Sequence, residues 1–561
     1  MILSMRIAMA VTKRYRVLFQ SRYYTSVVLS NVYPDVSTSA ACVRTNSIVL
    51  GLQELGKQQQ QRHDDGDEYH DDDHCYHGKK TSKPIIKMNN SSNSGNFKTN
   101  NNCVYYATST DIKDIKNPFA GVVKKYNPDY NNMGVTEIIH LPPNRSDLME
   151  KHFGGGLSSR RQSTTDNEDK NRDEDKTKRQ EKAAVVDLVV FDRFYMEEAH
   201  SFRFRQSFPD AVLVLDMQDM HSLRWGRHAI VKAWDKENEH QKKKDPMGCL
   251  SSVMDYLPTA VADDRFTREL ASIHRSDLTL VCSPVELSLL ETVYRVPKDK
   301  LCLASFFVDE ESCCSPPFPQ QQSRHSSDND DEATSPRFVF CGNFKHAPNA
   351  DAVRLLMDFV WPQLRSELPT ASLHIYGAFC PLKQQQKASR DGIHIHGFEP
   401  DLTKIFGQEG SILLAPLRFG AGIKGKIVDA WTFGMPVVTT PIGSEGMTTT
   451  INNNNNDESL LFGGRVAFTL DGFCESAIDL VKRPEDYCQA QANGRFLLEK
   501  LFSANRNQES LQRRLLKVLD KDSLARKRQS DYTQAMLWHQ SQRSTEFFSR
   551  WVELKENVAQ R

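Results

Sequence analysis

The chain has 561 residues, which is long enough for two domains together with additional segments. Its 72 lysine and arginine residues balance 72 aspartate and glutamate residues, so the composition excludes a global basic field for nucleic acid. The 12 cysteines include no Cys-x-x-Cys pair, which argues against a zinc site or disulfide framework and for a reducing compartment. No apolar run is long enough to span a bilayer, so we expect no transmembrane segment.

Residues 1–25 have the composition of an organelle-targeting leader, because they are basic, contain serine and threonine, and include no acidic residue. Arg22–Ser26 is a candidate processing site. The alternative is that Arg16–Gln20 is a strand of the fold. We therefore expect cytoplasmic residence, with mitochondrial import as the second possibility.

The first domain is expected over residues 26–308. It begins with a short strand at Ser26–Ser30, followed by small residues and a helix over Cys42–Leu55. Val185–Phe191 is a continuous apolar strand of the kind that is buried on both faces of a parallel sheet. Alternating strands and helices of this type predict a doubly wound α/β domain.

Two stretches of this domain, near 57–102 and 154–182, are polar and low in complexity. They cannot bury enough apolar surface to fold, so we expect disordered insertions. The histidines and aspartates of His63–His77 could bind a divalent metal weakly, but they lack the fixed spacing of a metal site. Residues 309–336 are rich in serine, proline and glutamine and are expected to form the interdomain linker.

Polar residues follow the strand expected at Ala211–Leu215. In open α/β sheets ligands bind beyond the carboxyl ends of the strands, so Asp216, Asp219, His221 and Arg224 are placed to face a ligand. The alternative is that Asp219 caps a helix, with a satisfied histidine behind it.

The second domain is expected over residues 337–525, starting with a strand at Arg337–Phe344. The last segment, 526–561, is expected to form C-terminal helices with an aromatic stripe that includes Trp538 and Trp551. This stripe packs back onto the first domain or binds a partner.

A glycine-rich loop opens a helix in the middle of the second domain. Gly420 and Gly422 allow a tight turn, and the helix expected over Ile423–Thr432 carries Lys424 and Lys426 in its first turn. Cations at this end oppose the helix dipole, unless an anion such as phosphate binds there. Asp429, one turn later, is placed to accept hydrogen bonds from sugar hydroxyls. The alternative is an ordinary strand–loop–helix unit with surface lysines.

This stretch resembles the donor loop of glycosyltransferase family 4, also called glycosyl transferases group 1. The family usually has two glutamates eight residues apart, the second followed by Ala and then Gly-x-Pro-Val-Val. Asp429 and Ala430 with Gly434–Val438 match the second half, whereas the first glutamate falls on Ala421. The Gly-Ala-Gly-x-Lys-Gly-Lys loop is similar to that of one branch of the family.

The resemblance implies an α/β fold of two doubly wound Rossmann-like domains, the GT-B fold, with a cleft between them. It also implies retaining transfer of a sugar from a nucleotide sugar, with the donor mainly on the second domain and the acceptor on the first. Catalysis is assigned to His221 and Asp219. The residues assigned to donor binding are Arg418, Gly422, Lys424, Gly425, Lys426, Asp429, Gly342, Asn343, Ser39 and Ala40, with Lys345 or His346 as possible substitutes for a basic group at Asn343.

Lysines that neutralise the leaving diphosphate make a metal unnecessary, so we expect no metal and no cofactor besides the nucleotide-sugar substrate. The expected partners are this nucleotide sugar and a carbohydrate, lipid or protein acceptor, with no nucleic acid. Ala421 and Asn343 favour a first alternative, a non-catalytic sugar-nucleotide-binding protein. A sugar-nucleotide epimerase of similar shape is the second alternative.

Overall fold

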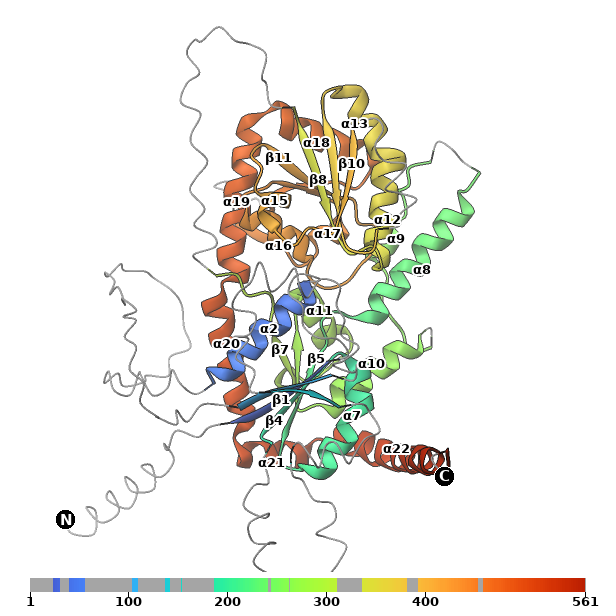
Figure 1. The fold of residues 1–561 in the computed structure, drawn as a ribbon, viewed down its shortest axis with the longest axis vertical. Helices are drawn as coiled ribbons and strands as arrows, with labels where there is room; N and C mark the ends of the chain where they lie inside the picture. The colour runs from blue at the N-terminus through green and yellow to red at the C-terminus, as the bar shows by residue number, and fades with distance from the viewer. Residues whose placement is uncertain are drawn as a thin grey trace, which may run out of the picture.

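The computed structural model contains two parallel sheets, each flanked by helices (Figure 1). It describes residues 24–30, 40–55, 103–108, 137–141, 153, 186–240, 244–261, 263–309, 335–380, 392–452 and 458–559. The expected insertions near 57–102 and 154–182, almost all of the leader and most of the linker lie outside these residues.

The first sheet has seven strands in the order β3-β2-β1-β4-β5-β6-β7, and every neighbouring pair is parallel. The chain order reverses between β1 and β4, which makes this pair the topological switch point. The strands are β1 (Thr25–Ser30), β2 (Cys103–Thr108), β3 (Glu137–His140), β4 (Leu188–Asp192), β5 (Val212–Asp216), β6 (Leu278–Val281) and β7 (Leu301–Leu303).

Helices connect these strands as the parallel pairing requires, because a crossover must return the chain to the starting edge. The Asp263 side chain caps one of them by accepting from the Arg265 amide. The helices are α2 (Ala40–Gln53), α7 (Phe194–Ser207), α8 (His221–Glu237), α9 (Leu250–Met254), α10 (Asp264–Arg275) and α11 (Pro284–Ser288), the last continued by a π-helical turn at Leu289–Val293.

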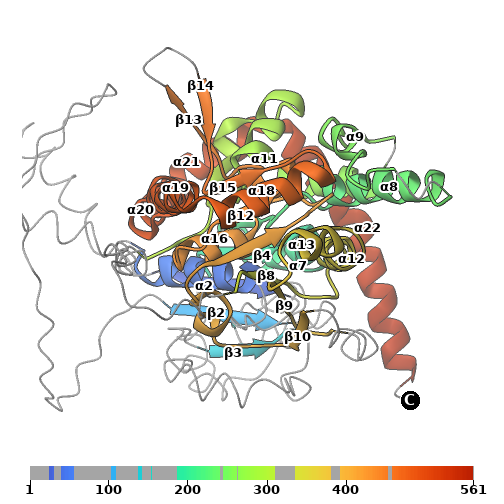
Figure 2. The same ribbon diagram turned by 90° about the horizontal axis from the view of Figure 1, so that it is seen from above.

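The second sheet has six parallel strands in the order β10-β9-β8-β11-β12-β15, with its switch point between β8 and β11. Two further strands form an antiparallel hairpin that projects from the domain (Figure 2). The sheet strands are β8 (Arg337–Cys341), β9 (Ser372–Tyr376), β10 (Ile393–Gly397), β11 (Ser411–Ala415), β12 (Val437–Thr439) and β15 (Gly464–Val466), and the hairpin is β13 (Thr449–Asn452) and β14 (Glu458–Leu461).

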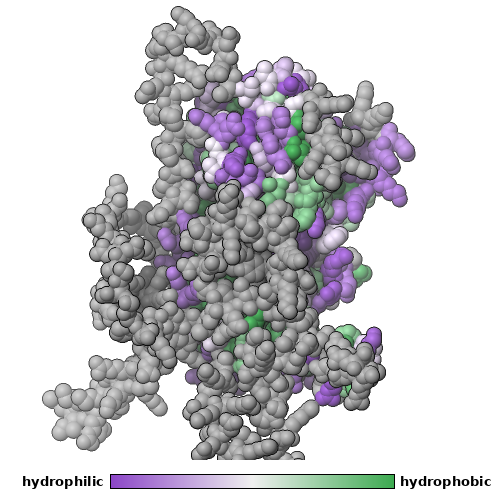
Figure 3. Space-filling view, in the orientation of Figure 1, coloured by the Kyte–Doolittle hydropathy of each residue, from purple (hydrophilic) through white to green (hydrophobic). Residues whose placement is uncertain are grey.

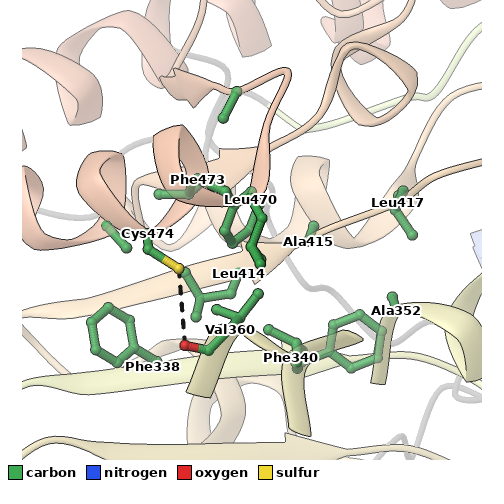
Figure 4. Packing of buried hydrophobic residues seen from close by; sticks show 14 of the residues in the cluster. Phe338, Phe340, Ala352, Val360, Leu414, Ala415, Leu417, Leu470, Phe473 and Cys474 are labelled. Atoms are coloured by element: carbon green, nitrogen blue, oxygen red, sulfur yellow. Dashed lines mark hydrogen bonds between the residues drawn. The ribbon is translucent and has the colours of Figure 1, made fainter. Parts of the chain in front are cut away.

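Apolar side chains from this sheet and its helices form the second core (Figure 4). Phe338 and Leu414 on the strands are fully buried, and so are Val360 and Phe473 on the covering helices. The described outer face of the domain in Figure 3 is largely hydrophilic. The helices are α12 (Ala347–Leu355), which continues through a π-helical turn into α13 (Trp361–Glu367), α15 (Leu402–Phe406), α16 (Gly425–Thr432), α17 (Pro441–Ser444), α18 (Leu470–Lys482) and α19 (Pro484–Phe502).

The end of the chain returns to the first domain. Val308 and Ser503 form a parallel bridge, so the two crossings of the chain between the domains lie side by side. Beyond this point α20 (Ala504–Leu519), α21 (Lys521–Ser530) and α22 (Tyr532–Ala559) follow, and Leu511 and Leu515 are buried in one core cluster with Val28 of β1. The return therefore begins at residue 503 rather than near the expected boundary at 525.

Helices α8 and α9 belong to the first domain by sequence but pack on the second. They follow β5 of the first sheet in the chain. Val231 and Leu250 are buried in the same cluster as Phe340 of β8. Figure 1 shows α8 leaving the first domain and running up beside the second. The two domains are thus joined by packed side chains as well as by the linker.

The prediction of two doubly wound domains is confirmed by these two sheets. None of the helices within the described residues is both long and apolar enough to cross a membrane.

Because α21 packs on the first domain through Arg528, we expect Arg528→Ala to destabilise that domain. Arg528 makes a two-pronged contact with the buried carboxylate of Asp277 and also donates to the carbonyl oxygens of Pro209 and Ala211. Removing it leaves a buried charge without its partner, which costs about 3–5 kcal/mol of unfolding free energy. Urea denaturation measures this loss. The exposed Arg526→Ala is the control and should stay within about 0.5 kcal/mol of the wild type; equal stability of both variants would contradict the prediction.

Candidate functional site

The loops that follow β5 and β11 meet where the two domains touch. Gly422 has a φ of 65°, and a Cβ atom added there would lie 3.0 Å from the Cβ of Asp219 and 3.5 Å from the backbone oxygen of Gln218. Only glycine combines this conformation with so close an approach. The structure therefore brings the glycine-rich loop of the second domain against the Asp219–His221 loop of the first.

The side chains of the β5 loop form a charged group. His221 Nε2 lies 3.2 Å from Asp219 Oδ1, and Arg224 pairs with the other oxygen of the same carboxylate. Burial raises the pKa of Asp219, but Arg224 and His221 outweigh it, so this pKa lies well below its usual range. The helix-cap alternative is not observed, because the N-cap of α8 is Met220 and it has no side-chain cap bond.

His346 extends this group across the domain boundary. Its Nε2 lies 3.3 Å from Arg224 Nη1, whereas the side chain of Lys345 lies over the ring of Phe379, at 3.8 Å from its centroid. Of the two substitutes considered for a basic group at Asn343, His346 is therefore the one in contact with the first domain.

Lys424 lies inside the glycine-rich loop. Its Nζ donates to the carbonyl oxygen of Gly422 at 2.6 Å, and burial lowers the pKa of the ammonium group. A Cβ at Gly420 would come within 3.4 Å of its Cε, so the loop is folded tightly around the lysine. The loop is followed directly by α16, whose first residue is the buried Gly425.

Lys426 connects α16 to the loop after β8. Its Nζ donates to Asn349 Oδ1 at 2.6 Å, and Asn349 Nδ2 donates to the backbone oxygen of Asn343 at 3.0 Å. A Cβ at Gly342 would approach Asn349 to 2.7 Å. Burial lowers the pKa of Lys426 to about 8. The predicted residues Gly342, Asn343 and Lys426 therefore lie together at the β8–β11 switch point, where parallel sheets bind ligands.

Asp429 is half-buried one turn after Lys426. Burial raises the pKa of its carboxyl group to about 7, and Lys426 counteracts part of that effect. Among the described residues this carboxyl group makes no hydrogen bond or ion pair that would occupy it. It is thus an available acceptor beside a cation.

Arg418 does not share the site of the lysines. Its guanidinium group is fully buried and donates to both oxygens of Asp235 and both oxygens of Asp351. Because two carboxylates already take up its donors, a donor diphosphate would have to displace them. Arg418 instead ties α8 to α12 and strand β11.

The loop after β1 is only partly described. Ser39 lies outside the described residues, and Ala40 is the first residue of α2. Arg44, the cation nearest to this loop in sequence, is buried, pairs with Asp216 and donates to the carbonyl oxygen of Ala304 at 2.8 Å. Its charge is therefore balanced inside the first domain.

Three residues at this junction were missed by sequence reasoning. Arg227 of α8 donates to the carbonyl oxygen of Gly420 at 2.9 Å and pairs with Glu445 at 2.8 Å. Glu286 of α11 accepts a hydrogen bond from the backbone of Gly422. No local pattern reveals their partners, since each partner lies more than 100 residues away.

Comparison with known proteins assigns the second domain to a family. Residues 335–469 match the model of the family described as "Glycosyl transferases group 1". This part of the chain belongs to the glycosyl transferases group 1. The match includes the loop after β8, the glycine-rich loop and α16, but not His221 or Asp219.

Several solved structures have a similar chain course. A glycosyltransferase from Rickettsia africae is 11% identical, with a TM-score of 0.47, and the alignment covers 90% of this chain and 99% of that chain. Anabaena Alr3699/HepE in complex with UDP and glucose is 9% identical, with a TM-score of 0.45 and coverage of 88% and 99%. The sucrose-phosphate synthase from Thermosynechococcus elongatus is 15% identical, with a TM-score of 0.39 and coverage of 61% and 76%. No curated protein sequence matches the chain.

The two doubly wound domains of this glycosyl transferase form the GT-B fold. Among the described residues, no group of three histidine, cysteine, aspartate or glutamate side chains is arranged to hold a metal ion.

The ion pairs of Arg418 predict a structural role for it. Arg418→Ala should lower the free energy of unfolding by on the order of 2–4 kcal/mol, because two carboxylates lose a buried partner. Arg354 pairs with the same two carboxylates but is 42% exposed, so Arg354→Ala should cost less than about 1 kcal/mol. Thermal unfolding compares the two variants. An Arg418→Ala protein of unchanged stability that no longer binds nucleotides would show the opposite, a donor-binding role.

Proposed function

We propose that the protein is a retaining, metal-independent glycosyltransferase, which moves a sugar from a nucleotide sugar to a carbohydrate, lipid or protein acceptor. One observation carries the proposal: the loop with Lys424 and Lys426 lies at the β8–β11 switch point and contacts the Asp219–His221 loop of the other domain. A diphosphate on the lysines would thus have its sugar directed toward His221.

The hydrogen bonds of the two lysines support a role in holding the leaving diphosphate. Lys424 donates to backbone carbonyl oxygens and Lys426 to the side-chain amide of Asn349, so within the described residues neither ammonium group is hydrogen-bonded to a carboxylate. Burial lowers the pKa of both groups, and the carboxylates near them, such as Glu445 and Asp429, offset only part of this effect. A bound diphosphate would supply the remaining compensation, and the lysines would in turn stabilise the charge that grows on it during transfer.

The proposed reaction breaks the bond between the anomeric carbon and the diphosphate oxygen. The acceptor hydroxyl oxygen then bonds to the same face of that carbon, and its proton passes to the departing phosphate oxygen. Asp429 accepts hydrogen bonds from hydroxyl groups of the donor, and His221, oriented by Asp219, contacts the sugar near the reacting carbon. The closely packed domain boundary excludes water, which competes with the acceptor.

Removing both lysines tests the diphosphate site. The Lys424→Ala/Lys426→Ala variant should lose roughly 10²–10³-fold in kcat/KM, the range seen when electrostatic stabilisation of a leaving group is removed. Transfer of sugar from the donor that the wild type accepts is the measurement. The exposed Lys404→Ala is the matched control and should keep its rate. Unchanged transfer in the double variant would exclude this role for the lysines.

Replacing Asp429 tests the hydroxyl contacts. Asp429→Asn keeps the shape of the side chain but removes its charge, and a hydrogen bond to a charged group contributes about 1.5–3 kcal/mol, or roughly 10–100-fold in affinity. Calorimetry with UDP and with UDP-glucose, and with GDP and GDP-mannose, locates the contact. If the variant binds both the nucleotide and the nucleotide sugar of a pair more weakly, Asp429 contacts the ribose. If it binds only the nucleotide sugar more weakly, Asp429 contacts the transferred sugar. Equal affinities of wild type and variant would exclude both contacts.

A panel of UDP- and GDP-sugars screened by thermal stabilisation tests the function as a whole, because a ligand that prefers the native state raises the melting temperature. Sugar transfer to an acceptor supports the transferase. Binding without transfer or hydrolysis supports the non-catalytic protein, the alternative that Ala421 and Asn343 favour. Conversion of the donor sugar without any acceptor identifies an epimerase.

A further inference from the structure

One carboxyl oxygen joins the two halves of the site. Glu286 Oε1 accepts the backbone N–H of Gly422 at 2.7 Å and that of Met220 at 3.2 Å. The first amide belongs to the glycine-rich loop of the second domain, and the second belongs to the β5 loop of the first. Glu286 itself lies in the first turn of α11 and is buried.

The two amides lie next to the groups that the proposed reaction uses. Met220 directly precedes His221, and Gly422 is two residues before Lys424. Glu286 therefore fixes the distance between the sugar-contacting histidine and the diphosphate-binding lysine. A second buried glutamate, Glu269, accepts the amides of His221 and Ser222 at 2.6 and 2.9 Å, but both belong to α8.

The surroundings of Glu286 disfavour its charged form. Its second oxygen, Oε2, is buried and has no hydrogen-bond partner in the described part of the chain. The carboxylate of Asp219 faces it from the β5 loop, and that of Glu445 faces it from the segment after α17. Burial and Asp219 raise the pKa of Glu286 to about 8.

Two other titratable groups face the same carboxyl group. The ammonium group of Lys424 approaches from the glycine-rich loop, and the thiol of Cys282 lies at the end of β6. Lys424 favours the charged form of Glu286, whereas burial, Asp219 and Glu445 oppose it. The balance favours a neutral carboxyl group in this arrangement of the loops.

We propose that Glu286 is a positioning residue of the transfer site, and that its carboxyl group must be protonated for the glycine-rich loop to seat against the Asp219–His221 loop. This inference rests on the proposed function, since it concerns the same diphosphate-binding loop. A neutral carboxyl group still accepts both amides through Oε1, and it does so without an unpaired buried charge.

The seated loop takes up one proton near neutral pH. With the loop withdrawn, the carboxyl group is in water and ionised above its usual pKa near 4.5; with the loop seated, it stays protonated up to about pH 8. Seating is therefore strongest at low pH and weakens by up to about tenfold for each pH unit between about 4.5 and 8. Above pH 8 it changes little further, because the carboxyl group is then ionised whether the loop is seated or withdrawn. Glutamine reproduces the shape and the accepting oxygen of the neutral form and cannot ionise.

Calorimetry with UDP and with GDP between pH 6 and pH 9.5 tests the inference on the full chain. The lysines titrate in every variant, so the comparison of wild type with Glu286→Gln isolates the carboxyl group. Glu286→Gln should bind like the wild type at pH 6.5, and its advantage should grow to at most roughly 30-fold by about pH 8.5 and then stay constant. Glu286→Ala, which loses both amide contacts, should bind weakly at every pH. Glu269→Gln, the matched control, should follow the pH dependence of the wild type.

Parallel affinities of wild type and Glu286→Gln across the whole pH range would overturn the inference. So would a Glu286→Gln protein as weak as Glu286→Ala at pH 6.5. A wild type that binds neither nucleotide would instead overturn the proposed function. In that event the melting temperatures still decide on Glu286. The wild type should melt progressively below Glu286→Gln as the pH rises from 6 to 8, with a constant difference above pH 8, whereas parallel melting temperatures over the whole range would count against the inference.

Discussion

Helix α8 is the element on which the arrangement of the two domains depends. Its N-terminal amides are held by buried glutamates of the first domain, whereas its body contacts the second domain through Arg227 and Asp235. Because Val231 is also buried in the second core, separating the domains would expose apolar surface and break ion pairs together. The helix that begins at His221 therefore fixes how the Asp219–His221 loop faces the glycine-rich loop.

The cations near this boundary divide into two groups by their partners. Arg418 is surrounded by the carboxylates of Asp235 and Asp351 and so holds elements together. Lys424 and Lys426 are hydrogen-bonded only to neutral oxygens, and burial lowers both pKa values. The proposed diphosphate would meet ammonium groups whose burial is only partly offset by nearby carboxylates, whereas the donors of Arg418 are already taken up by two carboxylates.

Local patterns in the sequence were sufficient to predict the two doubly wound domains and the loop–helix unit at Lys424. The apolar run at Val185–Phe191 predicts a buried strand, and the glycines around position 421 predict a tight turn. Both predictions need only a few neighbouring residues. The roles of Arg418 and Glu286 could not be predicted in this way, because their partners come from distant segments: Asp235 is 183 residues from Arg418, and Gly422 is 136 residues from Glu286. Helices α20 and α21 were also missed, since their apolar faces are explained only by the first domain they cover.

The return of the chain at residue 503 makes the first domain discontinuous, since its core combines Val28 near the start with Leu511 and Leu515 near the end. On the ribosome the second domain can complete its own core while this last part is still inside the exit tunnel. The first domain cannot complete its core until synthesis is nearly finished, and until then part of its apolar sheet stays exposed. A premature stop before α20 would accordingly leave a folded second domain attached to an incomplete first domain.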